Sequence, residues 1–147
     1  MSNHKYYPEL LVSLQFGLIG LIVLFSRGFF SNFIALTIFI IGGLFGIWAL
    51  SYNRLGNFNI QPKMRDNAKL ITTGIYGYIR HPMYLSVIVM MLAFIFATPS
   101  QIEIVLFILL IIVLVLKAKK EEEIWLKESK EYTKYKEQTK LFIPYVL

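Results

Sequence analysis

The chain has 147 residues, a formal net charge of +6 and no cysteine, and 56% of its residues are hydrophobic. The lack of cysteine excludes disulfides, thiolate nucleophiles, iron–sulfur clusters and cysteine-ligated zinc. The mean hydropathy of +0.60 is far above that of a soluble domain of this length. The cations flank apolar segments and form no basic face, so nucleic acid is not an expected partner. We therefore expect one domain whose core is largely supplied by a bilayer.

Four apolar stretches are long enough, or nearly long enough, to cross a membrane: Leu10–Ser26, Phe29–Leu50, Met83–Thr98 and Ile102–Leu116. A spanning helix needs about 20 residues, or about 17 at the short end. Backbone groups in hydrocarbon must be hydrogen-bonded internally, so these stretches are predicted to be helices. The predicted fold class is an all-α polytopic membrane protein with about four transmembrane helices.

The predicted organisation places two N-terminal transmembrane helices at 1–53, a loop at 54–81, a transmembrane hairpin at 82–118 and a tail with an amphipathic helix at 119–147. Most cations lie in the 54–81 loop and in the tail. By the positive-inside rule, both termini and this loop are cytoplasmic. We expect an integral protein of a prokaryotic cell membrane, in contact with membrane lipids.

Two short polar clusters flank the predicted hairpin. Arg80-His81-Pro82-Met83-Tyr84 precedes its first arm, Glu121-Glu122-Glu123 follows its second, and Pro99-Ser100-Gln101 forms the turn between them. His81 lies about 18 residues before the turn and Glu122 about 22 after it, which is roughly 27 and 33 Å along two helices. Because these lengths differ by about one helical turn, both clusters are predicted to reach one membrane surface and to contact one small molecule.

The residue types of the two clusters suit a small polar site. Pro82 is typical of the first turn of a helix, where no N–H is needed. Arg80 offers a planar fork for a carboxylate or phosphate, and His81 offers a donor, an acceptor or a proton near neutral pH. The glutamates can accept from ribose hydroxyls or pair with an ammonium or a sulfonium. From the residues alone, a ligand site and a purely structural Arg80–glutamate ion pair that holds the hairpin together are equally favoured.

Small and polar residues inside the predicted helices indicate close packing. Gly42 with Gly46, and Ser13 with Gly17, are small-xxx-small pairs. We interpret them as contacts within the chain, with a homodimer as the alternative. Gln15 is polar at a costly depth and is predicted to bond a neighbouring helix or to touch a ligand.

Two further predictions concern the ends of the hairpin's second arm. Glu103 is predicted to snorkel at the outer membrane surface. In the tail, the residues Ile124, Trp125, Glu128, Tyr132 and Tyr135 recur at helical spacing. This pattern predicts an amphipathic helix on the membrane surface. The three adjacent glutamates favour instead a role in binding a cationic ligand or in an internal ion pair.

Several motifs together resemble one enzyme superfamily. They are Leu70–Leu85, which contains Arg80-His81-Pro82-Met83-Tyr84, then Glu122-Glu123-Ile124-Trp125-Leu126, Tyr132-Thr133-Lys134-Tyr135 and Ile143-Pro144. Over roughly the last two thirds of the chain, this pattern resembles the isoprenylcysteine carboxyl methyltransferase and phospholipid methyltransferase superfamily. The resemblance implies an integral membrane enzyme that uses S-adenosylmethionine, held in a pocket at the cytoplasmic end of the hairpin.

Transferred to the matching positions, the resemblance implies the following site residues: cofactor-binding His81, Pro82, Tyr84, Leu85, Glu122 and Glu123, with Arg80 and Glu123 as catalytic residues. Arg80 would orient an acidic substrate group or the carboxylate of the cofactor. No metal is expected. The superfamily often has glycine where Ser86 stands, which predicts looser packing there. Three successive glutamates leave the acidic pair open between Glu121-Glu122 and Glu122-Glu123.

The first functional hypothesis is a membrane methyltransferase whose acceptor is lipid-like or small and apolar and carries a carboxylate, an amine or a thiol. The second is an NADPH-dependent reductase, because sterol reductases carry a similar Arg-His-Pro-x-Tyr element. The third is a non-catalytic membrane scaffold that keeps the hairpin bridge for stability.

Overall fold

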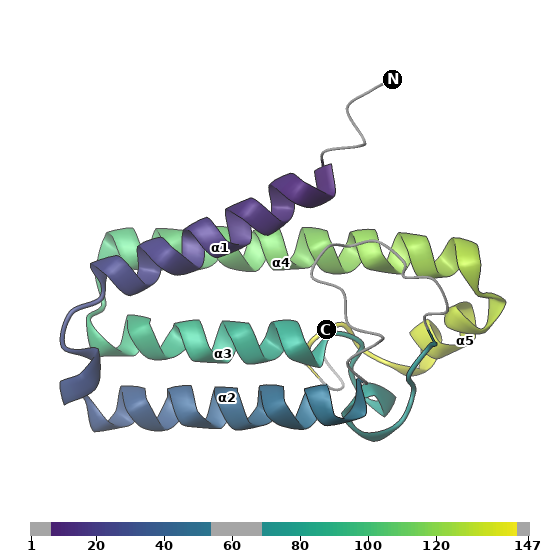
Figure 1. Ribbon diagram of the computed structural model, residues 1–147, viewed down its shortest axis with the longest axis horizontal. Coiled ribbons are helices and arrows are strands. Elements are labelled where there is room, and N and C mark those ends of the chain that lie inside the picture. The colour runs from purple at the N-terminus through teal and green to yellow at the C-terminus, as the bar shows by residue number, and fades with distance from the viewer. Residues whose placement is uncertain (1–6, 54–68, 144–147) are drawn as a thin grey trace.

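The computed structural model describes residues 7–53 and 69–143 of the chain. Its elements are α1 (Tyr7–Phe25), the 3-10 turn η1 (Phe29–Ser31), α2 (Phe33–Tyr52), the 3-10 turn η2 (Gly74–Gly77), α3 (Pro82–Ala97), α4 (Gln101–Glu128) and α5 (Lys130–Gln138). Four long helices lie side by side and α5 lies at one end of them (Figure 1). Within the described residues the only strand-like pairing is one isolated bridge. The predicted all-α class is confirmed.

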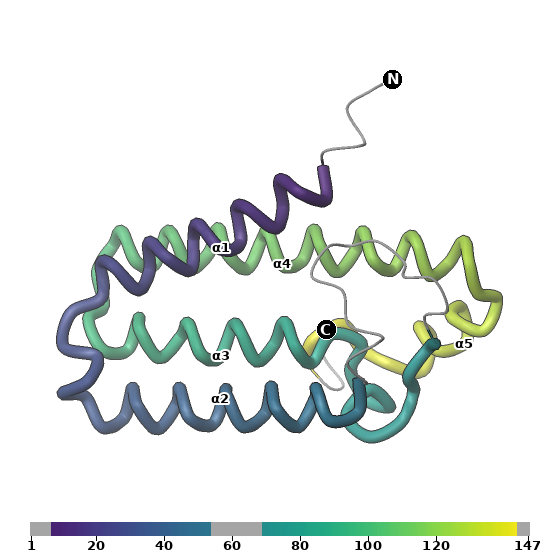
Figure 2. Tube along the Cα trace, viewed as in Figure 1, coloured from purple at the N-terminus to yellow at the C-terminus, as the bar shows by residue number. Residues whose placement is uncertain are grey.

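The four long helices form two pairs. α2 packs along α3, α1 packs along α4, and α3 and α4 are joined by a short turn (Figure 2). The core between them is built from side chains of all four helices, including Ile22, Ala35, Met91 and Leu110. The two polar clusters therefore lie at the end of the bundle where α3 begins, which is also the end that carries α5 (Figure 1).

The outer surface of the bundle is apolar. α1, α2 and α4 are long and apolar enough to cross a membrane, whereas α3 is a shorter apolar helix of 16 residues. At 1.5 Å per residue, α3 is about 24 Å long, less than the roughly 30 Å of hydrocarbon in a bilayer. Large side chains such as Leu24, Ile47 and Ile102 point outwards and are exposed. A helix that is apolar on all sides is typical of a membrane span.

Polar caps set the helix starts at the end of the bundle opposite the clusters. The side chain of Asn32 accepts from the Ala35 N–H at 3.1 Å, so α2 begins at Phe33, within the second apolar stretch. Ser100 accepts from the Glu103 N–H at 3.2 Å and donates to the Glu103 carboxylate at 2.9 Å. Glu103 is thus buried in a capping arrangement. The prediction that it snorkels at the surface is wrong, because the helix cap satisfies it locally.

α4 continues past the apolar run and ends only at Glu128. The predicted boundary between hairpin and tail at residue 118 therefore does not coincide with a helix end. The reason is that lysine, alanine and glutamate are strong helix formers, and no glycine or proline interrupts them before Ser129. After Ser129 the chain reverses into α5, which is amphipathic and buries Tyr132 and Tyr135 (Figure 1). Of the predicted 54–81 loop, residues 54–68 lie outside the described part.

The contact between α2 and α3 depends on small residues. A Cβ atom on Gly42 would lie 2.9 Å from Met90 Cγ and 3.0 Å from the Met90 backbone nitrogen, so only glycine allows this approach. Ser86 is buried in the same interface, and its hydroxyl donates to the Gly42 carbonyl at 2.8 Å. The expectation of loose packing at Ser86 is wrong, because the hydroxyl is satisfied across the interface. Around Gly17, by contrast, nothing described lies within 4 Å of an added Cβ.

The α2–α3 contact predicts different effects for two neighbouring glycines. Replacing Gly42 by alanine places a methyl group against the α3 backbone, and overpacking of this kind costs about 1–3 kcal/mol. Replacing Gly43 by alanine meets nothing within 4 Å and gives the same gain in helix propensity. We expect a lower melting temperature in detergent for Gly42→Ala and an unchanged or higher one for Gly43→Ala. Equal melting temperatures would contradict the described contact.

Candidate active site

The backbone just before α3 is held by the segment that follows α5. Arg80 N–H donates to the Lys140 carbonyl at 2.8 Å, His81 N–H donates to the Leu141 carbonyl at 3.1 Å, and Lys140 N–H donates to the Tyr78 carbonyl at 3.0 Å. Pro82, which has no N–H, then starts α3. This local order fixes the direction in which the Arg80 and His81 side chains leave the backbone.

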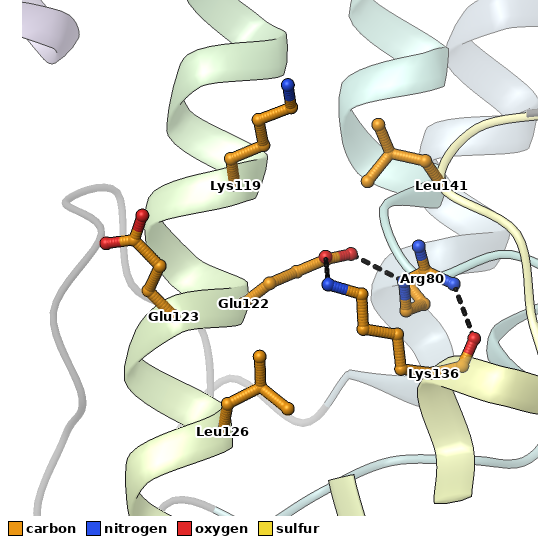
Figure 3. A pocket seen from close by; sticks show the side chains of 7 residues that line it. All are labelled: Arg80, Lys119, Glu122, Glu123, Leu126, Lys136 and Leu141. Atoms are coloured by element: carbon orange, nitrogen blue, oxygen red, sulfur yellow. Dashed lines mark hydrogen bonds and ion pairs between the residues drawn. The ribbon is translucent and has the colours of Figure 1, made fainter. Parts of the chain in front are cut away.

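Arg80 connects three elements at this end of the bundle. Its Nε donates to Glu122 Oε1 of α4 at 2.5 Å, and both side chains are almost fully buried. Its guanidinium also donates to the Thr139 carbonyl and, at 3.2 Å, to the Lys136 carbonyl (Figure 3). These carbonyls end α5, where the helix dipole favours a cation. Arg80 thus joins the start of α3, the extension of α4 and the end of α5.

Glu122 contacts two further basic side chains besides Arg80. Lys136 of α5 lies 2.8 Å from Glu122 Oε2, on the other oxygen from the one that faces Arg80 (Figure 3). His81 Nε2 lies 3.5 Å from Glu122 Oε1. A buried carboxylate is stable only when it is paired in this way.

His81 lies in a flat aromatic arrangement between two carboxylates. Its ring is parallel to that of Tyr84, with the centroids 5.5 Å apart and an interplanar angle of 3°, and Phe142 approaches it edge-on. Its Nδ1 lies 3.5 Å from Glu121 Oε2. Its buried Nε2 makes no hydrogen bond within the described part of the chain. Burial lowers the pKa of His81, but the nearby carboxylates of Glu121 and Glu122 outweigh it, so the pKa is raised.

The helical phase of α4 decides which glutamates face this cluster. Glu121 accepts a hydrogen bond from the Tyr84 hydroxyl, and Glu122 pairs with Arg80. Glu123 points to another side of α4 than Glu122 (Figure 3). Its exposed carboxylate pairs with Lys120 at 3.1 Å. Glu121 and Glu122 are therefore the two glutamates that face His81 and Tyr84.

The remaining predicted site residues have different surroundings. Pro82 is buried at the first position of α3. Leu85, which lies in the first turn of the same helix, packs against a small apolar cluster that includes Ala49 and Ile79. The structure thus brings His81, Tyr84, Arg80 and Glu122 into contact, whereas Glu123 only lines the cavity beside them.

The site includes residues that sequence reasoning missed. Lys117, one helical turn before Glu121, lies with its ammonium 5.1 Å from the centroid of the Tyr84 ring. Its spacing from Glu121 is the one signal that points to it. Lys136 and Thr139 arrive only because α5 folds back, and nothing in their sequence neighbourhood indicates that contact.

A cavity of about 370 Å³ opens beside the Arg80–Glu122 pair. Its lining combines cations, carboxylates and two leucines: Arg80, Lys119, Glu122, Glu123, Leu126, Lys136 and Leu141 (Figure 3). Such a lining suits a small molecule that carries both charge signs and an apolar part.

The fold and this site define a class: an integral membrane protein with a charged and aromatic site at one end of an apolar helical bundle. The family model described as phospholipid methyltransferase matches residues 30–134. The chain belongs to this family, and thereby to the superfamily that its motifs resemble, and it is a membrane methyltransferase. No curated protein matches the sequence.

The raised pKa of His81 predicts a specific pH dependence of stability. The folded protein binds the proton of His81 more tightly than the unfolded chain, whose histidine pKa is about 6.5. This stabilisation is complete below about pH 6.5 and is lost as the pH rises through the folded-state pKa. We expect the melting temperature of the wild type, relative to that of His81→Gln, to fall as the pH rises above about 6.5. A constant difference between the melting temperatures of the two proteins at all these pH values would contradict the ion pairing of His81.

Proposed function

We propose that this methyltransferase uses S-adenosylmethionine and methylates a lipid-like or small apolar acceptor that carries a carboxylate, an amine or a thiol. The observation that carries the proposal is the meeting of two adjacent carboxylates, Glu121 and Glu122, with the parallel rings of His81 and Tyr84. This meeting occurs at the end of an apolar bundle, within reach of both water and lipid. Family membership supports the methyl transfer itself.

The chemistry of the donor set fits the cofactor. Carboxylates suit an ammonium, a sulfonium or ribose hydroxyls, and flat aromatic faces suit a purine or a sulfonium. The buried Nε2 of His81 lies 3.5 Å from Glu122 Oε1 but makes no hydrogen bond within the described residues, so it can bond a ligand here. Arg80, Lys119 and Lys136 line the adjoining cavity and suit a carboxylate. We assign Glu121, Glu122, His81 and Tyr84 to hold the cofactor, with Arg80 as the residue that orients an acidic group.

The demands on the protein are modest. S-adenosylmethionine, when bound, supplies a methyl group that is already activated on a sulfonium. The residues must position the acceptor and exclude water, and precise positioning alone can lower a barrier by several kcal/mol. A carboxylate acceptor needs no base. For an amine or a thiol, the proton would go to a carboxylate oxygen of Glu121 or to Nε2 of His81 in its neutral form.

The proposal includes a location and an access route. With the cationic ends of the helices inside, both termini and the site are cytoplasmic, in a prokaryotic cell membrane. The cofactor then enters from the cytoplasm and the acceptor from the bilayer, between helices. For the exposed Ser13–Gly17 face of α1 we propose the alternative, a homodimer contact.

Titration calorimetry of detergent-solubilised protein with S-adenosylhomocysteine tests the proposal. We expect saturable binding by the wild type and at least about tenfold weaker binding by Glu121→Gln, since it removes a partly buried charge that faces the ligand. Glu131→Gln is the matched control, because it makes the same chemical change on an exposed residue of α5 that does not line the cavity. We expect its affinity to remain within about twofold of the wild type.

Three outcomes separate the alternatives. No binding at millimolar ligand by folded wild type would overturn the proposal and favour a scaffold. Binding of NADPH in place of S-adenosylhomocysteine would favour a reductase. A greater loss of binding in Glu123→Gln than in Glu121→Gln would keep the cofactor but move the acidic pair to Glu122-Glu123.

A further inference from the structure

One cation of the bundle is buried more deeply than its neighbours. Lys117 is 1% exposed and is the largest fully buried residue in the described part of the chain. It lies on α4 between the apolar run that ends at Leu116 and the glutamates of the site. Burial of an ammonium costs free energy unless strong partners replace its water.

The direct contacts of Lys117 are with neutral groups, and the Glu121 carboxylate attracts its ammonium from beyond ion-pair distance. Its Nζ donates to Gln15 Oε1 of α1 at 2.5 Å and lies 5.1 Å from the centroid of the Tyr84 ring. Within the described residues, no carboxylate forms an ion pair with it. A cation over an aromatic face and one amide oxygen compensate only part of the desolvation cost. A leucine at this position would be cheaper for folding alone.

Tyr84 is held from two directions. Its hydroxyl donates to Glu121 Oε1, and the Lys117 ammonium lies near its ring. Lys117 and Glu121 are one helical turn apart on α4, so both contacts come from one rigid element. The ring is thereby fixed parallel to His81.

We propose that Lys117 is a positioning residue, which fixes the Tyr84 ring for cofactor binding, and that Gln15 makes α1 part of the site by holding the Lys117 ammonium in place. This inference rests on the proposed function, since Tyr84 is assigned there to the cofactor. Lys117 itself is too buried to touch a ligand, so it acts through Tyr84.

The proposal gives α1 a specific role. Gln15 is buried on the same face of α1 as Leu11 and Ile22, the face that packs on α4. A polar side chain there has no other described partner than Lys117. The pair Gln15–Lys117 therefore transmits the position of α1 to the site across 102 positions of sequence.

A double-mutant cycle on the affinity for S-adenosylhomocysteine tests this. We expect Lys117→Met to weaken binding about five- to tenfold in the wild-type background, which corresponds to a typical coupling between contacting residues. In a Tyr84→Leu background, the same substitution should change the affinity less than about twofold, because its effect passes through the ring. Lys127→Met, a change of the same kind at an exposed position of α4, is the control and should leave the affinity unchanged.

Gln15→Met provides a second, milder variant that keeps the Lys117 charge. It should weaken binding in the wild-type background and have little further effect in the Lys117→Met background. If Lys117→Met does not fold, Gln15→Met replaces it in the double-mutant cycle with Tyr84→Leu. Equal losses in both Tyr84 backgrounds, or no loss at all, would overturn the inference while the wild type still binds. A wild type that does not bind would overturn the proposed function and this inference with it.

Discussion

The ion pair between Arg80 and Glu122 is the interaction on which the rest of the structure depends. It joins the start of α3 to the extension of α4, and the other donors of Arg80 hold the end of α5. Elsewhere the four long helices contact one another mainly through apolar and small side chains. Lipid is as apolar as these side chains, so such contacts do not by themselves select one arrangement. A buried, directional pair supplies the missing specificity.

The charges around this pair are balanced within the protein. Glu122 faces Arg80, Lys136 and His81, and Glu121 faces His81 and the Tyr84 hydroxyl. A ligand that uses these carboxylates therefore exchanges internal partners for its own groups. Lys136 is the partner best placed to yield, because its side chain is 41% exposed and lines the cavity. The contacts of Arg80 are thus the fixed part of this charge cluster, and the contact of Lys136 with Glu122 is the part that a ligand can replace.

Much of the fold and part of the site could be predicted from the sequence, because hydrophobic length and helix rise are local properties. Hydrophobic length, helix rise and the position of Pro82 predicted the hairpin, the start of α3 and the approach of the two clusters. The register of the glutamates could not be predicted. Adjacent residues of a helix differ by about 100° in direction, and the rotation of α4 depends on its packing against α1 and α3. The return of α5 and the contact of Gln15 with Lys117 depend on the assembled fold in the same way.

The central claim is tested most directly by the free energy of unfolding of Arg80→Gln, Glu122→Gln and the double variant, measured by sodium dodecyl sulfate titration in mixed micelles. If the pair holds the two arms of the hairpin together, each single variant leaves one buried charge without its partner. The double variant should then be more stable than the sum of the single effects predicts, by about 1–3 kcal/mol. Strictly additive effects would show that Arg80 and Glu122 are not coupled and would contradict the account.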